Sequence, residues 1–156
     1  MAFTAGIISD THGLLRPEAE RVLSTCDAII HAGDIGSQDL FRALDSFAPV
    51  FGVRGNTDWE PWARELPLND VVEISGKFFY IIHVLGNIDL DPAAAGIDAV
   101  IFGHSHMPEI YTRDNVLYMN PGSIGPRRFT KPVTLGKIII DEKGLHPEII
   151  YLEPIH

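Results

Sequence analysis

The chain has 156 residues, 46% of them apolar and 21% charged, a composition typical of a folded domain with a substantial core and not of a disordered chain. A formal net charge of −9, from 12 basic and 21 acidic residues, argues against general binding to nucleic acids or anionic membranes, since both require a basic surface. The charge does not exclude a small phosphate ester held by metal ions, because bound cations reverse the local field.

Strand and helix patterns alternate in the first half of the chain. Buried strands are predicted over residues 3–9, 28–32 and 50–54. Pro17 is suited to the first turn of a helix that ends near Ser24. Ser37 is the expected N-cap of a second helix, whose apolar positions extend to Ala48, and a short helical turn is expected over 59–64.

The second half predicts mostly paired strands. Three hairpins are expected, with strands over 71–75 and 77–84, 109–113 and 116–120, and 133–141 and 145–152. One more buried strand is expected over 98–103, and residues 121–132, with three prolines and two glycines, are predicted to form a long loop. This order of elements indicates one α/β (α+β) domain over residues 1–156, with two sheets packed face to face and helices outside.

The single cysteine, Cys26, cannot form an internal disulfide, which fits a reducing compartment. The N-terminus lacks the basic segment followed by a long apolar one that would indicate a signal peptide. No apolar run approaches the ~20 residues that span a bilayer. We therefore expect a cytoplasmic protein without a membrane partner. Exposed strand edges in the second half could pair between two copies of the chain, so a homo-oligomer is possible.

Five short apolar runs each end in residues that can bind a metal ion. In a parallel α/β sheet such residues meet in the crevice beyond the carboxyl ends of the strands. Two aspartates, one asparagine and four histidines would converge there: Asp10, His12, Asp34, Asn56, His83, His104 and His106. Seven oxygen and nitrogen donors with no thiolate are too many for one ion and suit two.

Each of these motifs also has an ordinary interpretation when it stands alone. Asp10 could cap a helix, the residues around Asp34 and Asn56 could form turns, and a lone histidine in an apolar strand is usually a hydrogen-bonded core residue. His31 is expected to be such a core histidine. The joint occurrence of the motifs at successive strand ends favours a binding site. Asp58 would then orient neighbouring groups.

The motifs together resemble those of the calcineurin-like metallophosphoesterases, and among these the small YfcE-type phosphodiesterases. The matching motifs are Asp10-x-His12, Gly33-Asp34, Gly55-Asn56-x-Asp58, His83, Gly103-His104-x-His106 and Asn120-Pro121-Gly122-Ser123. The resemblance implies a four-layer αββα sandwich of two mixed β-sheets flanked by helices, with a two-metal centre at one sheet edge. It also implies that Asp10, His12 and His106 hold one ion. Asn56, His83 and His104 would hold the other, with Asp34 bridging.

Two departures from the family pattern concern the leaving group. The family often shows His-Gly-His where this chain has His83-Val84-Leu85, and many relatives carry Cys or His at the position of Thr57. In relatives with His there, that residue can protonate the leaving group, which Thr57 does poorly. We therefore expect activity on esters with good leaving groups.

The expected function is that of a phosphodiesterase that hydrolyses a P–O bond of a small phosphate ester by attack of a metal-bridging hydroxide. No catalytic side chain is expected beyond that hydroxide, with Asn56 and His104 in support. Manganese is the expected metal, mainly by resemblance, with Ni, Fe, Co or Zn as alternatives. A phosphomonoesterase is a further reading, and so is a non-catalytic scaffold like the retromer subunit of this fold. The complete donor set favours an enzyme.

Residues outside the metal motifs also have candidate roles. Arg127 and Arg128 could steer the phosphate, although ordinary solvated loop charges explain them equally well. Asn120 is expected to orient the histidine loop. Trp59 and Trp62 could line a substrate pocket, but core packing or a dimer contact is the simpler expectation.

Overall fold

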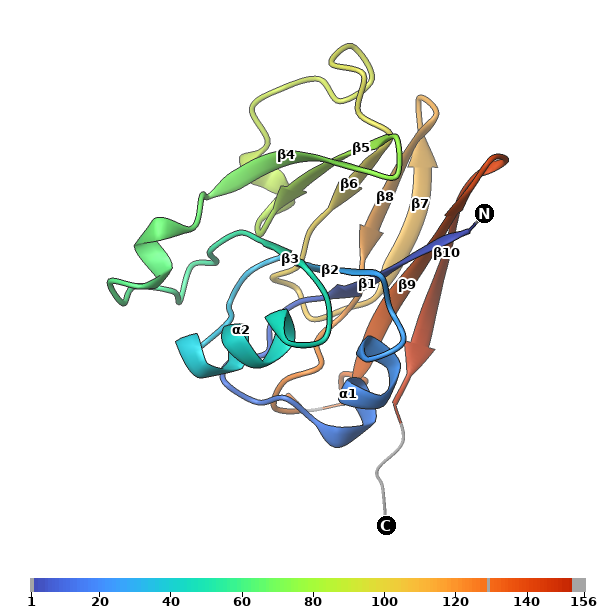
Figure 1. Ribbon diagram of the computed structural model, residues 1–156. Helices are drawn as coiled ribbons and strands as arrows, with labels where there is room; N and C mark the ends of the chain where they lie inside the picture. The colour runs from blue at the N-terminus through green and yellow to red at the C-terminus, as the bar shows by residue number, and fades with distance from the viewer. Residues whose placement is uncertain (1, 129, 153–156) are drawn as a thin grey trace.

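The computed structural model describes residues 2–128 and 130–152, and its ten strands form two five-stranded sheets packed face to face (Figure 1). The first sheet has the strand order β10-β9-β1-β2-β3. Its strands are β1 (Phe3–Ile8), β2 (Ala28–His31), β3 (Val50–Gly52), β9 (Thr134–Asp141) and β10 (Gly144–Tyr151). The second sheet has the order β4-β5-β6-β8-β7. Its strands are β4 (Asn69–Ile74), β5 (Lys77–Ile82), β6 (Ala99–Ile101), β7 (Glu109–Arg113) and β8 (Val116–Asn120).

Parallel pairing brings the ends of six strands to one edge of the sandwich. In the first sheet β1, β2 and β3 are parallel neighbours, and His31 at the end of β2 is paired with both Ile8 and Gly52. In the second sheet β6 runs parallel to β5 and β8, with Ile101 opposite Ile81 and Met119. The loops that follow these strands therefore start side by side, although they come from distant parts of the sequence.

The two sheets enclose the main hydrophobic core. Ile7 and Ile30 from the first sheet pack against Phe79, Ile101 and Met119 from the second, and all five are fully buried. Burial of each such side chain stabilises the fold by roughly 1.5–3 kcal/mol relative to exposure. The sandwich thus forms a rigid base for the loops at its edge.

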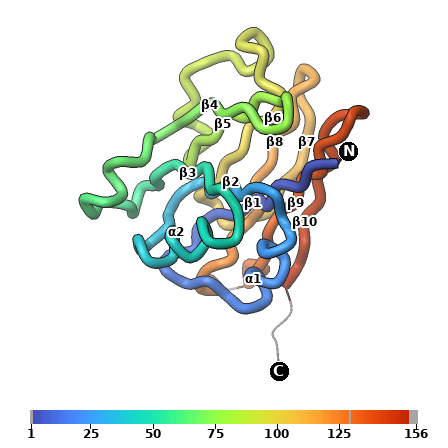
Figure 2. Tube along the Cα trace, in the orientation of Figure 1, coloured from blue at the N-terminus to red at the C-terminus, as the bar shows by residue number. Residues whose placement is uncertain are grey.

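The two α-helices lie on the outer face of the first sheet (Figures 1 and 2). They are α1 (Pro17–Leu23) and α2 (Gln38–Asp45). Helix α1 begins at Pro17 as expected, and the Ser37 hydroxyl caps α2 by accepting a hydrogen bond from the Leu40 N–H at 3.1 Å. Leu23 and Leu44 anchor the helices on the sheet through a second apolar cluster.

The outer face of the second sheet is covered differently. Here the segment 85–97, which begins with the 3-10 turn η2 (Leu85–Asn87), packs on Tyr80 and Tyr118. This segment contains three residues that disfavour an α-helix, Gly86, Pro92 and Gly96. The α/β sandwich is confirmed, and in the part of the chain that the structure describes its fourth layer is this segment rather than an α-helix.

The three expected hairpins are present. Ser75 and Gly76 join β4 to β5 with φ values of 52° and 82°, the positive values of a type I′ turn. Asp114 and Asn115 join β7 to β8 in the same way, with φ of 51° and 63°. The β9–β10 pair forms the third hairpin and lies alongside β1 (Figure 2).

Some element boundaries differ from the expectation. Strand β3 ends at Gly52 rather than at residue 54, because the Arg54 N–H bonds to the Pro67 carbonyl at 2.9 Å and the chain leaves the sheet. The helical turn expected over 59–64 occurs as the 3-10 helix η1 (Ala63–Glu65). The expected loop over 121–132 is described except for residue 129. No helix among the described residues is long and apolar enough to cross a membrane.

Candidate metal centre

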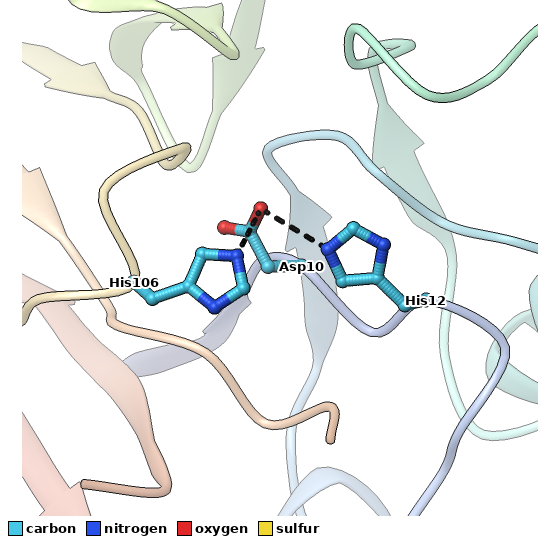
Figure 3. Close-up of side chains that lie close together, drawn as sticks. All are labelled: Asp10, His12 and His106. Atoms are coloured by element: carbon cyan, nitrogen blue, oxygen red, sulfur yellow. Dashed lines mark ion pairs between the residues drawn. The ribbon is translucent and has the colours of Figure 1, made fainter. Parts of the chain in front are cut away.

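The loop after β1 brings the first predicted metal group together with the loop after β6. The Asp10 carboxylate lies between two imidazoles (Figure 3). Asp10 Oδ1 is 3.3 Å from His106 Nε2 and 3.8 Å from His12 Nε2. The rings of His12 and His106 have centroids 5.5 Å apart. These three donor atoms face one point.

A second group shares the same carboxylate. His83 Nε2, directly after β5, lies 3.1 Å from Asp34 Oδ2 and 3.8 Å from Asp10 Oδ1. Asp34 Oδ2 is also 3.8 Å from His12 Nε2. Asp34 therefore faces members of both groups, which is the position its predicted bridging role requires. Asp10 Oδ1 reaches both groups as well, which the resemblance did not anticipate.

The two remaining predicted ligands form a pair at the rim. His104 Nδ1 lies 3.2 Å from Asn56 Oδ1, and both residues are exposed. The His104 ring meets the His83 ring edge-on, with centroids 5.3 Å apart. The structure thus brings five of the seven predicted ligands into close contact and sets the other two beside His83.

The donor atoms at the centre lack other partners. Asp10 Oδ1, His12 Nε2 and His83 Nε2 are buried and have no hydrogen-bond partner among the described residues. Each buried unsatisfied polar atom costs about 1–3 kcal/mol. Divalent cations held by the two groups would satisfy all three atoms. The chemistry of this donor set therefore fits a metal centre.

The tautomer of His83 also fits metal binding. His83 Nδ1 lies 2.8 Å from the Ala32 carbonyl, a contact that requires Nδ1 to carry the proton. Nε2 is then left with its lone pair toward the two carboxylates. Fixing the second ring nitrogen in this way is how proteins usually orient a histidine ligand.

The backbone is strained at the predicted ligands. Eight described residues other than glycine have positive φ, and three of them lie in the hairpin turns. The other five are predicted ligands: Asp10 (57°), His12 (45°), Asp34 (58°), His104 (75°) and His106 (62°). A left-handed conformation costs an L residue roughly 1–2 kcal/mol, and such strain gathers at functional sites. It also turns His104 and His106 away from the alternation of a regular strand.

Buried polar side chains hold these loops in place. The Asp58 carboxylate accepts hydrogen bonds from the N–H groups of Ile35, Gly36 and Gly55 at 2.8–3.2 Å. It therefore links the Asp34 loop to the Asn56 loop and does not face the donor cluster. The carboxylate position is consistent with the orienting role expected for Asp58.

Asn120 fixes the histidine loop from the end of β8. Its amide N–H₂ donates to the Gly103 carbonyl and to the Ser105 hydroxyl, each at 3.1 Å, and its Oδ1 accepts from the Gly122 N–H. Lys131, which the sequence did not single out, donates to the Ser105 carbonyl at 2.6 Å. The loop that carries His104 and His106 is thus held from two sides.

His31 is a fully buried, hydrogen-bonded core histidine, as expected. The Gly33 N–H donates to His31 Nδ1 at 3.0 Å, so the proton resides on Nε2 and is donated to the Thr11 hydroxyl at 2.9 Å. Thr11 in turn donates to the Ile35 carbonyl at 2.6 Å. Burial, reinforced by the charge of His83, lowers the pKa of His31 to about 3.

We expect His31 to make stability depend on pH. The unfolded chain gains a proton on His31 below about pH 6.5, whereas the folded protein does not until about pH 3, so the free energy of unfolding falls by up to about 1.4 kcal/mol per pH unit between these values. The H31Q variant should show a shallower slope in chelator-containing buffer, measured by urea unfolding from pH 7.5 to 5.5. Parallel curves for the two proteins would contradict this assignment.

The charge balance at the centre favours ionised carboxylates. Burial works to raise the pKa of Asp34, but the His83 imidazole at 3.1 Å and the hydrogen bond from the Thr57 N–H outweigh it and hold the pKa far below the usual value. For His83, burial lowers the pKa, but Asp34 and Asp10 reverse this and raise it. The field that attracts a proton to His83 would equally attract a metal ion.

The two arginines of the 121–132 loop do not contact the donor cluster. Both are exposed, and Arg127 Nε donates to the Lys131 carbonyl at 3.3 Å. The charges of Arg128 and Lys131 do reach His106. They join burial in lowering its pKa, against the opposing effect of Asp10. Steering of a phosphate by Arg127 and Arg128 stays a prediction.

Sequence reasoning missed Arg54, which lines a cavity together with Asn56 and His83. The available signal was a cation directly before the Gly55-Asn56 motif.

The expectation of core packing is confirmed for Trp62, because it packs against the apolar cluster under α2. Core packing is wrong for Trp59, whose side chain is 75% exposed and donates from Nε1 to the Asn56 carbonyl at 2.9 Å.

The chain belongs to the calcineurin-like phosphoesterase superfamily, whose domain matches residues 3–143. A probable metallophosphoesterase from Methanothermobacter thermautotrophicus is 34% identical over 160 residues, which cover 93% of this chain and 90% of the relative. Phosphodiesterase YfcE from Escherichia coli K12 is 29% identical over 161 residues, which cover 83% of this chain and 84% of the relative. Family and relatives agree on phosphoester hydrolysis as the class of chemistry.

Solved structures support the same fold. A structure described as that of a novel archaeal phosphodiesterase superimposes with a TM-score of 0.79 at 27% identity, covering 96% of this chain and all of the other. Vacuolar protein sorting 29 from Cryptosporidium parvum superimposes with a TM-score of 0.75 at 16% identity, covering 98% and 99%. At that identity the second match shows a shared fold alone.

Proposed function

We propose that this protein is a metal-dependent phosphodiesterase that hydrolyses a P–O bond of small phosphate esters. The observation that carries the proposal is the set of three buried, unpartnered donor atoms on Asp10, His12 and His83, in which both imidazoles face the Asp10 and Asp34 carboxylates. The family membership and the names of the relatives support the same activity.

The residues divide into two metal groups with shared carboxylates. Asp10, His12 and His106 would hold one ion, and His83, Asn56 and His104 the other, with Asp34 between them. Two divalent ions, when bound, supply Lewis acidity and lower the pKa of water from 15.7 toward ~7. The donors are all oxygen and nitrogen, which suits Mn, our expected metal, and also Fe, Co, Ni or Zn.

The chain offers the leaving group no proton at the two positions where relatives carry candidate acids. Thr57 is exposed, and its N–H donates to Asp34 Oδ1 at 3.0 Å. Leu85 packs onto the apolar cluster of the second sheet. The remaining protein contribution is to position the ester and to stabilise the charge on its phosphoryl oxygens. Such a site favours esters of acidic alcohols, such as aryl esters.

Release of nitrophenol from bis-(p-nitrophenyl) phosphate tests the proposal. We expect hydrolysis in the presence of Mn, its loss on chelation, and its recovery when Mn is restored. A parallel assay with p-nitrophenyl phosphate separates a diesterase from a monoesterase by the ratio of the two kcat/KM values. A folded, Mn-loaded protein that hydrolyses neither ester would refute the proposal.

A folded, Mn-loaded protein without hydrolytic activity would favour the alternative hypothesis of a non-catalytic scaffold. The structural likeness to vacuolar protein sorting 29 is the observation in its support. Against it stands the complete set of seven donors in this chain. A scaffold has no need for buried carboxylates and imidazoles without partners, because each one costs stability.

A further inference from the structure

A cavity opens beside the predicted metal centre and shares two of its residues. It has a volume of about 250 Å³ and includes Asn56 and His83 in its wall. Leu68, Ile82 and Val84 make part of the wall apolar. An apolar cavity of about 150 Å³ holds benzene, so this space suits one small aryl or aliphatic group.

Among the described residues that line this cavity, Arg54 is the one arginine or lysine. Its Nε is the fourth buried side-chain atom without a hydrogen-bond partner among the described residues, and the other three lie in the metal centre. No carboxylate of the described residues lies within ion-pair distance of its guanidinium, although the chain carries 21 acidic residues. A buried guanidinium nitrogen left without an acceptor points to an anionic ligand.

A second hollow adjoins the first at Arg54 and Asn56. It has a volume of about 180 Å³, and Trp59 and Arg64 contribute to its wall. The hydrogen bond from Trp59 Nε1 to the Asn56 carbonyl fixes the exposed indole at this rim. Arg54 and Asn56 therefore stand between a partly apolar cavity and a shallower hollow with an aromatic wall.

We propose that Arg54 binds the phosphate anion of a phosphodiester whose two ester groups occupy the two hollows on either side of it. This inference rests on the proposed function and names the substrate class: diesters with one small apolar group in the cavity and a planar group against Trp59. A guanidinium suits this task because it presents its N–H donors in a fixed fork that matches phosphate oxygens.

The R54Q variant tests the anion site, with R21Q on α1 as the matched control. Hydrogen bonds to charged groups contribute about 1.5–3 kcal/mol, so R54Q should weaken binding of inorganic phosphate to the Mn-loaded protein about ten- to hundredfold by calorimetry. Its KM for bis-(p-nitrophenyl) phosphate should rise by a similar factor, with Mn content and Tm unchanged. R54K should recover part of the loss, and R21Q should match the wild type.

If R54Q binds phosphate as tightly as the wild type, the assignment of the anion site is overturned. It is also overturned if phosphate affinity falls only in proportion to a loss of bound Mn. Phosphate binding is measured without turnover, so it tests Arg54 even if the wild type hydrolyses no ester. A wild-type protein that hydrolyses no ester would refute the proposed function and leave the anion site to be judged by phosphate binding.

The W59A variant tests the second hollow. Stacking on an aromatic side chain contributes about 1–3 kcal/mol, so kcat/KM for the diester should fall at least about fivefold. The value for the R21Q control should stay within about twofold of the wild type. No loss for the diester in W59A, or a loss that only follows lost Mn, would overturn the assignment of this hollow.

Discussion

Replacing Asp34 with alanine is expected to reduce phosphodiester hydrolysis to the background rate while the protein stays folded. Asp34 Oδ2 lies 3.1 Å from His83 Nε2 and 3.8 Å from His12 Nε2, so this one carboxylate faces both predicted metal groups. Its loss should exceed the 10–100-fold effect typical of residues that only support metal ligands. The initial rate of nitrophenol release in Mn-replete buffer measures the change.

The D34N variant separates charge from geometry. The asparagine oxygen can still accept the hydrogen bond that Thr57 N–H gives to Asp34 Oδ1, whereas the negative charge is gone. We expect D34N to be nearly as inactive as D34A and to bind less Mn. D141N, in an exposed pair with His146, should leave the rate unchanged. Full activity of D34A with ample Mn would rule out the bridging role.

Replacing Gly36 with alanine is expected to cause a large loss of stability at a position outside the donor set. Gly36 has φ of 97°, and a Cβ there would overlap the backbone of His12 and Gly13. The variant must therefore adopt a left-handed conformation and also displace the loop that carries His12. Strain of about 1–2 kcal/mol adds to an overpacking cost of about 1–3 kcal/mol.

Gly13 provides the matched control for Gly36. It has φ of 83°, but a Cβ there would have no atom within 4 Å, so G13A incurs the backbone strain alone. Because about 1 kcal/mol shifts the Tm of a chain of this size by roughly 2–4 °C, G36A should melt several degrees below G13A. Its Mn affinity should also fall. Equal melting temperatures for the two variants would show that the loops after β1 and β2 are not packed as described.

The sequence was sufficient to predict the parts of the fold and site that depend on local patterns. Apolar runs ended by ligand residues located five of the loops at the sheet edge. Ser37 was recognised as a helix cap, and Asp114-Asn115 as a hairpin turn, because both features depend on a few neighbouring residues. The segment 85–97 was harder, because its structure is set by packing on Tyr80 and Tyr118 from other strands.

The finer geometry of the site depends on contacts between distant segments. The position of Asp10 Oδ1 between His83 and His106 follows from how three loops meet, which no spacing reveals. Arg54 was overlooked because an arginine beside a glycine has no distinctive pattern in sequence. Its buried, unpartnered Nε appears only when the cavity wall is assembled.

Metal content is the most direct test of the central claim that side chains from five loops form a two-ion centre. The protein should be purified without chelator, incubated with Mn, freed of excess metal by gel filtration, and analysed for elements. The structure and the donor set predict two ions per chain, with a marked decrease in D10A and none in D141N. A folded protein that retains no Mn, and no other transition metal, would contradict the account.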